Sequence, residues 1–224
     1  MKKLLIAALA LGLVIGCSSD DTADNAQSQA QDGDVPRPAA TGQPDQEIEV
    51  QYEPTGIQFT LAADRDTIAG ISFRPVEQWV ELPASGMRKA QWMYGPLEDE
   101  KDSAVCVVYY FGPTSGGGVQ ANLDRWINQM SLHDGRNPKE AAIQYTLDID
   151  GMTAHVLSLY GTYNESMSPM QTGNAVAHEN YRMVAVIFEG PQGSVFFKLT
   201  GPDYTARAMI EGFMPMMNDV KQVG

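Results

Sequence analysis

The sequence contains few of the residues from which catalytic and metal sites are usually built. Its 224 residues include two cysteines and three histidines, and none of the histidines lies in an H-E-x-x-H pattern. The G-x-S-x-G pattern of α/β-hydrolases and the Gly-Lys-Ser/Thr end of a phosphate-binding loop do not occur either. These absences favour a protein that is not an enzyme, without excluding one, and we expect neither a cofactor nor a metal.

Basic residues are also scarce. The chain has 15 Lys and Arg against 28 Asp and Glu, which gives a formal net charge of −13. This balance argues against binding to nucleic acid, and against attachment to an anionic membrane through a basic patch. The acidic residues are concentrated between positions 18 and 55, where Arg37 is the one base.

The chain has no apolar run long enough to cross a bilayer, which takes about 20 residues. Its longest run, Leu4 to Ile15, follows two lysines and ends at Gly16-Cys17, the arrangement of an exported signal segment. Val14-Ile-Gly-Cys17 resembles the lipobox of bacterial lipoproteins. This resemblance implies that residues 1–16 are a signal peptide and that Cys17 is lipidated with acyl chains such as palmitate. Ser18 then implies the outer membrane, facing the periplasm.

A polar segment separates this signal from the rest of the chain. Residues 17–55 are rich in Asp, Gln, Ser, Gly and Pro and poor in large apolar side chains, so they cannot bury enough surface to offset chain entropy. We expect them to form a disordered acidic linker. Residues 56–224 are then a single globular domain of ordinary size.

Two hairpins are predicted in this domain. Asp150-Gly151 favours a two-residue type I′ turn, which pairs Ile149 with Met152 and places alternate apolar residues of 143–158 on one face. The second hairpin spans 181–200 around Gly190-Pro-Gln-Gly193. Its first strand is apolar at every position from 183 to 188, which indicates cover on both faces. Further strands are expected at 57–62, 71–73, 87–94 and 104–111.

Two helices are predicted from apolar side chains that repeat at helical spacing. The first helix enters from Gly118 and the second follows Gly201-Pro202, and Pro215 should kink the second helix or end it early. The stripe of the first helix consists of Val119, Leu123, Trp126, Ile127 and Met130, and that of the second of Ala206, Met209, Ile210, Phe213 and Met217. The predicted fold class is α+β, with a mainly antiparallel sheet flanked by helices.

Four features of the sequence are candidates for functional sites. The glycine-rich turn at 111–119, with Asn122 and Arg125 after it, could receive an anion, but a flexible turn explains it as well. Residues 161–180 have little periodicity and are expected to form a long loop containing Tyr163, Met167, Met170 and His178. Its two methionines could bind copper(I) through their thioethers, although they are few ligands. Cys106 lies in an apolar run and is expected to be buried and unreactive.

The segment Ile71-Ser-Phe-Arg-Pro-Val-Glu-Gln-Trp79, followed by Met87-Arg-Lys-Ala90, resembles the start of Mog1/PsbP-like domains. This resemblance implies an αβα sandwich that serves binding or assembly. We therefore expect an envelope-anchored lipoprotein with a non-catalytic binding or assembly domain. Its partners would be the membrane, through the lipid, and an envelope protein or small ligand. The alternative is a periplasmic hydrolase with its active site near the 161–180 loop.

Overall fold

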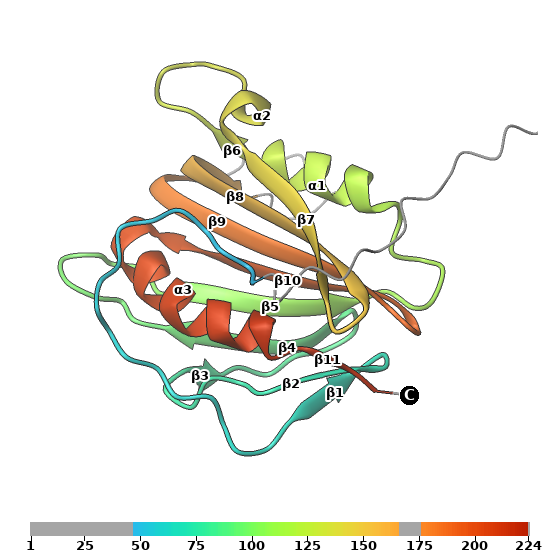
Figure 1. Ribbon diagram of the computed structural model, residues 1–224. Helices are drawn as coiled ribbons and strands as arrows, with labels where there is room; N and C mark the ends of the chain where they lie inside the picture. The colour runs from blue at the N-terminus through green and yellow to red at the C-terminus, as the bar shows by residue number, and fades with distance from the viewer. Residues whose placement is uncertain (1–46, 166–175, 224) are drawn as a thin grey trace, which may run out of the picture. The chain divides into compact units, whose positions relative to one another are not determined.

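The computed structural model describes residues 47–165 and 176–223, which form an α+β domain of mostly antiparallel strands (Figure 1). The expected class is therefore confirmed. In chain order the elements are β1 (Asp66–Ile68), β2 (Ile71–Phe73), β3 (Val80–Glu81), β4 (Arg88–Tyr94), β5 (Ala104–Tyr110), α1 (Val119–Ile127), β6 (Met130–Ser131), α2 (Pro138–Ala141), β7 (Ile143–Ile149), β8 (Met152–Glu165), β9 (Val176–Gly190), β10 (Gly193–Pro202), α3 (Asp203–Asn218) and β11 (Lys221–Gln222).

Within the described ranges, the main sheet has eight strands in the order β3-β4-β5-β10-β9-β8-β6, and β7 also pairs with β8. The two predicted hairpins form its centre. In the first, Ile149 pairs with Met152, and the turn residues Asp150 and Gly151 have positive φ values of 53° and 78°, as a type I′ turn requires. The second hairpin closes at the pair Gly190–Gly193. The register of the first hairpin and the turn position of the second agree with the prediction.

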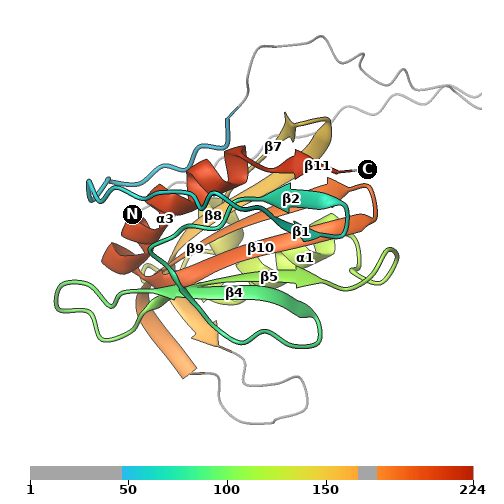
Figure 2. The same cartoon turned by 90° about the horizontal axis from the view of Figure 1, so that it is seen from below.

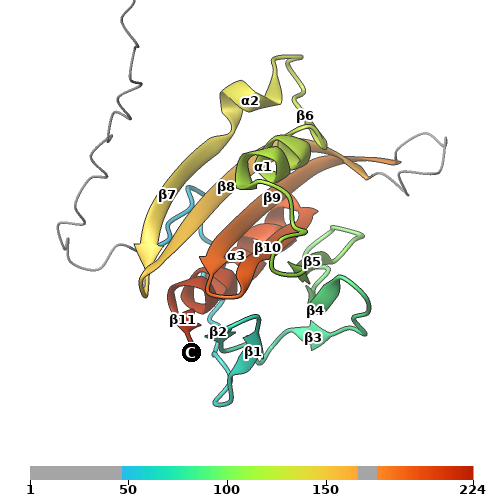
Figure 3. The ribbon, with the colours of Figure 1, turned by 90° about the vertical axis from the view of Figure 1, so that its right-hand side faces the viewer.

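Helices cover the two faces of this sheet (Figure 3). Successive residues of β9 separate the two layers: Val184, Val186 and Phe188 pack with α3, while Met183, Ala185 and Ile187 pack with α1. This explains why β9 is apolar at every position, since both faces are buried. We call the two layers the α3 face and the α1 face.

A three-stranded sheet in the order β1-β2-β11 lies on the α3 side (Figure 2). It brings the C-terminal strand β11 against β2, and Ile71 and Phe73 of β2 are fully buried. The junction between α3 and β11 is held by Asp219, which accepts hydrogen bonds from Arg65 and Arg74 at 2.7 Å each. The two arginines thus tie the β1–β2 hairpin to the C-terminal end of α3.

The two predicted helices are confirmed, with one difference at each C-terminus. α1 ends at Ile127, and Met130 of its expected stripe lies in β6, because the chain turns there to pair with Tyr163 of β8. α3 continues past Pro215 to Asn218, so the proline does not end the helix early. Only one turn follows Pro215, and within it the Asp219 N–H donates to the Pro215 carbonyl.

Two expected boundaries were wrong. The segment 57–62 is not a strand, because only Leu61 forms an isolated bridge, to Val76, beside Pro75, which has no N–H to donate. The described residues at both ends of the expected loop 161–180 are strand, since β8 runs to Glu165 and β9 starts at Val176. A register shift between Gly161 and Tyr163 interrupts the alternation that would have marked the strand.

The packed chain also begins before the boundary expected at residue 56. Ile48 is 1% exposed, and its N–H donates to the Asn218 side chain on α3. Thr55 donates through its backbone N–H and its hydroxyl to Glu211 of the same helix. We call residues 47–55 the N-terminal strap. No helix in the described ranges is long and apolar enough to cross a membrane.

Candidate functional site

The outer edge of β8 is interrupted. β8 pairs with β7 from Met152 to Ser158 and with β6 at Thr162 and Tyr163, so residues 159–161 have neither strand beside them. The chain leaves the sheet after β6, passes through α2 and returns at β7. This detour leaves a gap in the sheet edge at Leu159, Tyr160 and Gly161.

The register defines which backbone groups face this gap. In a two-residue hairpin, the residues that flank the turn exchange both backbone hydrogen bonds. Those residues are Ile149 and Met152, so every second residue of β8 from Met152 to Ser158 directs its N–H and C=O toward β7. Tyr160 is the next residue in this series. Among the described residues, no strand lies opposite Tyr160 on this side, so its N–H and C=O face the gap.

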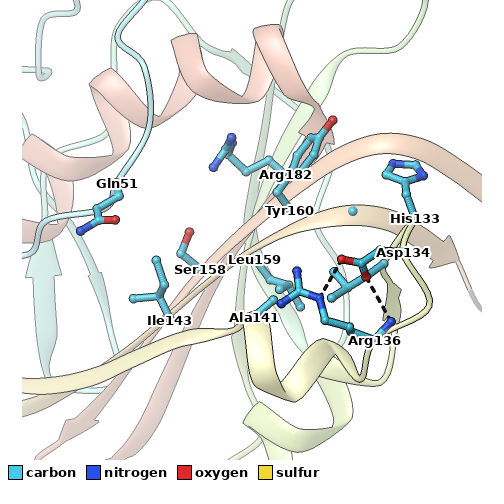
Figure 4. Close-up of a pocket in the computed structure, with 12 residues that line it drawn as sticks. Gln51, His133, Asp134, Arg136, Ala141, Ile143, Ser158, Leu159, Tyr160 and Arg182 are labelled. Carbon is cyan, nitrogen blue, oxygen red and sulfur yellow. Dashed lines mark hydrogen bonds and ion pairs between the residues drawn. The ribbon is translucent and has the colours of Figure 1, made fainter.

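A pocket of about 380 Å³ occupies the gap (Figure 4). Its floor is the β8 segment from Ser158 to Gly161, and its walls come from the detour, from Arg182 on β9 and from Gln51 in the strap. Seven of its lining residues carry polar side chains: Gln51, His133, Asp134, Arg136, Ser158, Tyr160 and Arg182. The pocket can therefore offer both donors and acceptors.

Two arginines give this pocket a basic lining. Arg182 is 14% exposed and contacts Asp203 through Nε and Nη2 at 2.9 and 2.8 Å, and its guanidinium lies 5.4 Å from the centre of the Tyr160 ring. Arg136 donates from Nε to Asp134 at 2.7 Å, and this hydrogen bond holds the pKa of Asp134 below its usual range. Among the described residues, Nη1 of Arg182 and both terminal nitrogens of Arg136 form no hydrogen bond.

The three histidines lie in different parts of the fold. His133 lines the pocket, but Figure 4 places it at the opposite end from Ser158. The Nε2 atom of His155 lies 3.3 Å from Glu189 on the neighbouring strand. His178 lies on β9 opposite Tyr163. Within the described ranges, no cluster of three or more His, Cys, Asp or Glu could hold a metal ion.

A second cluster lies on the α1 face, around Lys198 of β10. The Lys198 side chain is 8% exposed, and its Nζ donates to Oε1 of Gln129 at 2.6 Å. The rings of Trp126 and Tyr163 lie 5.9 and 5.0 Å from the ammonium. Burial, with a smaller contribution from the positive Arg125, lowers the pKa of Lys198 to about 7.

Titratable groups continue from this lysine toward β9. The ring of Tyr163 stacks on that of Tyr181, whose hydroxyl donates to Asp102 at 2.9 Å. His178 lies between two carboxylates, with Nδ1 3.8 Å from Asp102 and Nε2 3.4 Å from Glu165. Burial raises the pKa of Tyr163 to about 12, and burial together with Asp102 also raises the pKa of Tyr181. The predicted residues Tyr163 and His178 are thus brought together, by strands rather than by a loop.

The other candidate residues from the sequence that the structure describes have structural roles. Asn122 donates to the carbonyls of Gly116 and Gly118 and accepts from Arg125, so these side chains stabilise the glycine-rich turn. Cys106 is fully buried, which raises the pKa of its thiol. Cys17, Met167 and Met170 lie outside the described residues.

Three features were missed by reasoning from the sequence. The gap beside Tyr160 depends on where β7 and β6 end, which no local pattern shows. The Glu100 carboxylate accepts from the N–H groups of Tyr204 and Thr205 at the start of α3, a contact that no sequence pattern indicated. Lys198 did have a signal, because it is the one charged residue in the apolar run 195–199.

Comparison with known proteins adds little to this geometry. No protein-family model matches the chain. No curated protein matches it either. One solved structure that it resembles is PA94, a protein of unknown function from Pseudomonas aeruginosa, at 15% identity and a TM-score of 0.33 over 71% of this chain and 94% of the other. A likeness at that TM-score defines neither the fold family nor the function.

Proposed function

We propose that this protein is an envelope-anchored lipoprotein whose domain is a non-catalytic binding or assembly module. The observation that carries the proposal is the pocket at the gap in β8, where backbone groups and arginine nitrogens without partners in the described ranges face a cavity of ligand size. The lipobox-like segment ending at Cys17 supports the anchor. The proposal includes the finer fold assignment, a Mog1/PsbP-like αβα sandwich, which helices on both faces of the sheet support.

The anchor is tested by intact-mass spectrometry and membrane fractionation of the chain expressed in a Gram-negative host. Wild type is expected in the outer-membrane fraction with an acyl mass shift, and Cys17→Ala without either. Cys106→Ala is the matched control, because it removes the other cysteine from a buried site and should keep both the mass shift and the fractionation. An identical mass for wild type and Cys17→Ala would reject the anchor.

Binding at the pocket is tested with a photo-crosslinking amino acid. Placed at Ile143, which is 41% exposed on the pocket rim, it should crosslink a ligand or partner in the envelope. Val80 on β3 is 58% exposed and serves as the control, because it does not line the pocket. Equal crosslinking at both positions, or none at Ile143, would count against a binding module that uses this site.

One observation favours hydrolysis as a second candidate function. Lys198, with a pKa near 7, could act as a general base, and it lies against Tyr163, next to His178. A panel of ester, peptide and glycoside substrates tests this candidate. Hydrolysis that is lost in Lys198→Met and His178→Ala, with the fold retained by circular dichroism, would support it. Inertness of the wild type toward the whole panel would reject it.

A further inference from the structure

We propose that the pocket holds an extended segment of a partner protein, aligned antiparallel to β8, with an acidic side chain between Arg136 and Arg182. This inference rests on the proposed binding function and specifies its ligand. The gap lies where β7 would run if it continued beyond Ile143 along β8. An added segment would therefore continue the ladder of β7 beside β8.

The backbone of β8 gives the segment its direction and length. Tyr160 directs one N–H and one C=O into the gap, the pair of groups with which a strand residue binds its antiparallel neighbour. Three positions of β8, from Leu159 to Gly161, pair with no strand on this edge, although the backbone of Ser131 approaches Gly161. At about 3.4 Å per residue, three residues of extended chain span on the order of 10 Å. The ligand is therefore a short stretch within a longer chain.

The side chains around the gap select the charge of this segment. Arg182 comes from β9 and Arg136 from the segment before α2, and both line the pocket that a segment lying along β8 would enter (Figure 4). Each guanidinium already contacts one aspartate but keeps at least one terminal nitrogen without a hydrogen bond in the described ranges. A carboxylate can accept from such nitrogens through charge-assisted hydrogen bonds. In a chain of net charge −13, a pocket lined by two arginines and one aspartate favours an acidic segment over a basic one.

The probe is a blocked peptide, acetyl-Thr-Val-Glu-Val-Thr-amide, added to the mature lipidated protein labelled with ¹⁵N in detergent micelles. Its blocked ends leave the Glu side chain as its only carboxylate. We expect saturable shifts of the Tyr160 amide resonance and at least about tenfold slower exchange of that amide hydrogen, because the peptide supplies its missing acceptor. The Ser158 amide, which already faces β7, should keep its exchange rate. The analogue with Gln in place of Glu should bind roughly tenfold more weakly.

Two matched variants test whether Arg136 causes the preference for the Glu peptide over the Gln peptide. Arg136→Gln should reduce the preference for Glu over Gln, whereas Lys139→Gln, which removes an equally exposed positive charge outside the pocket lining, should leave the preference unchanged. Shifts that map elsewhere, an unprotected Tyr160 amide, or equal affinity for both peptides would overturn the inference. If no peptide binds while crosslinking at Ile143 persists, this inference fails and the binding function stands. If crosslinking at Ile143 is also absent, both fail.

Discussion

The two faces of the main sheet are built differently, although the same strands supply both. On the α3 face, a helix of 16 residues packs on apolar side chains, and the rings of Phe73, Phe188 and Phe197 meet edge to face. On the α1 face, a helix of 9 residues covers a smaller cluster, which has Lys198 beside it and Asn122 within α1. Both faces bury polar side chains, but those of the α3 face are small hydroxyls, Ser72, Ser158 and Thr205, whereas the α1 face buries the Asn122 amide and the Lys198 ammonium.

This difference separates stability from candidate chemistry. Apolar burial contributes roughly 25 cal/mol per Å², so the α3 face, with its larger apolar cluster, should hold most of the folding free energy. A buried ammonium with a neutral hydrogen-bond acceptor works against folding. Burial of the Lys198 ammonium thus lowers the stability of the fold, and buried charges of this kind are frequent at functional sites.

The largest expected effect is from truncating a phenylalanine on each face. Phe197→Ala removes a fully buried ring that contacts Phe73 and Phe188, and we expect a loss of about 4–5 kcal/mol. Phe196→Ala, on the opposite face of β10, should cost about 3 kcal/mol, because its neighbour Phe111 is only half-buried and can relax into the space. Urea denaturation measures both. Equal losses would mean that the two faces contribute alike.

The second largest expected effect is a gain in stability, and it comes from replacing Lys198. A pKa lowered to about 7 means that native Lys198 loses its proton near pH 7, whereas the unfolded chain keeps it up to about pH 10.5. Between these values the unfolded state binds more protons, so the stability contributed by this site rises with pH. Below pH 7 both states are protonated, and the full cost of burying the charge is present.

Lys198→Met should therefore stabilise the protein by about 2 kcal/mol at pH 6, less than the full cost because the bond to Gln129 is also lost. The gain should shrink as the pH rises from 7 to 10. Urea denaturation at several pH values measures it, and Lys101→Met, at an exposed site, is the control and should show no such trend. A variant less stable than wild type at pH 6 would mean that the ammonium stabilises the α1 face.

A third comparison concerns how α3 is held at its start. The Glu100 carboxylate accepts from the N–H groups of Tyr204 and Thr205 at 2.9 and 2.8 Å, where the helix dipole favours a negative group. Glu100→Ala should cost about 1–2 kcal/mol, and Glu100→Gln about half as much, because one acceptor remains. Asp99→Ala in the same turn should be nearly neutral. Thermal denaturation distinguishes the three, and equal values for Glu100→Ala and Asp99→Ala would exclude the capping role.

Much of the fold could be predicted from local chemistry. Asp150-Gly151 determined a turn, and the turn determined the register, so the first hairpin was correct residue by residue. The apolar residues of β9 correctly indicated two buried faces. The extension of β8 past Gly161 was missed, because its register shift and its partly exposed end lack the alternation that marks a half-buried strand.

The candidate site was less predictable. The gap beside Tyr160 exists because two strands stop on the same edge of β8, which depends on tertiary pairing. Arg136 and Arg182 are 46 positions apart in the chain and lie in unrelated local patterns. The strap 47–55 was assigned to the linker because it is polar, although Ile48 and Tyr52 anchor it. Contacts across long sequence distances create these features, and no window of sequence contains them.

The smallest expected effect tests the start of α1. Gly118 caps this helix without a side-chain hydrogen bond, and Asn122 instead donates to the Gly116 and Gly118 carbonyls at 2.8 and 3.0 Å. Asn122→Ala should cost about 0.5–1 kcal/mol, because solvent can reach the exposed glycine turn and replace part of what is lost. Gln120→Ala on the exposed side of α1 is the control. Hydrogen exchange should accelerate in α1 and not in α3, since the two helices are attached to opposite faces. Faster exchange in both helices would mean that the two faces unfold together, so that a destabilisation of α1 also reaches α3 through the sheet.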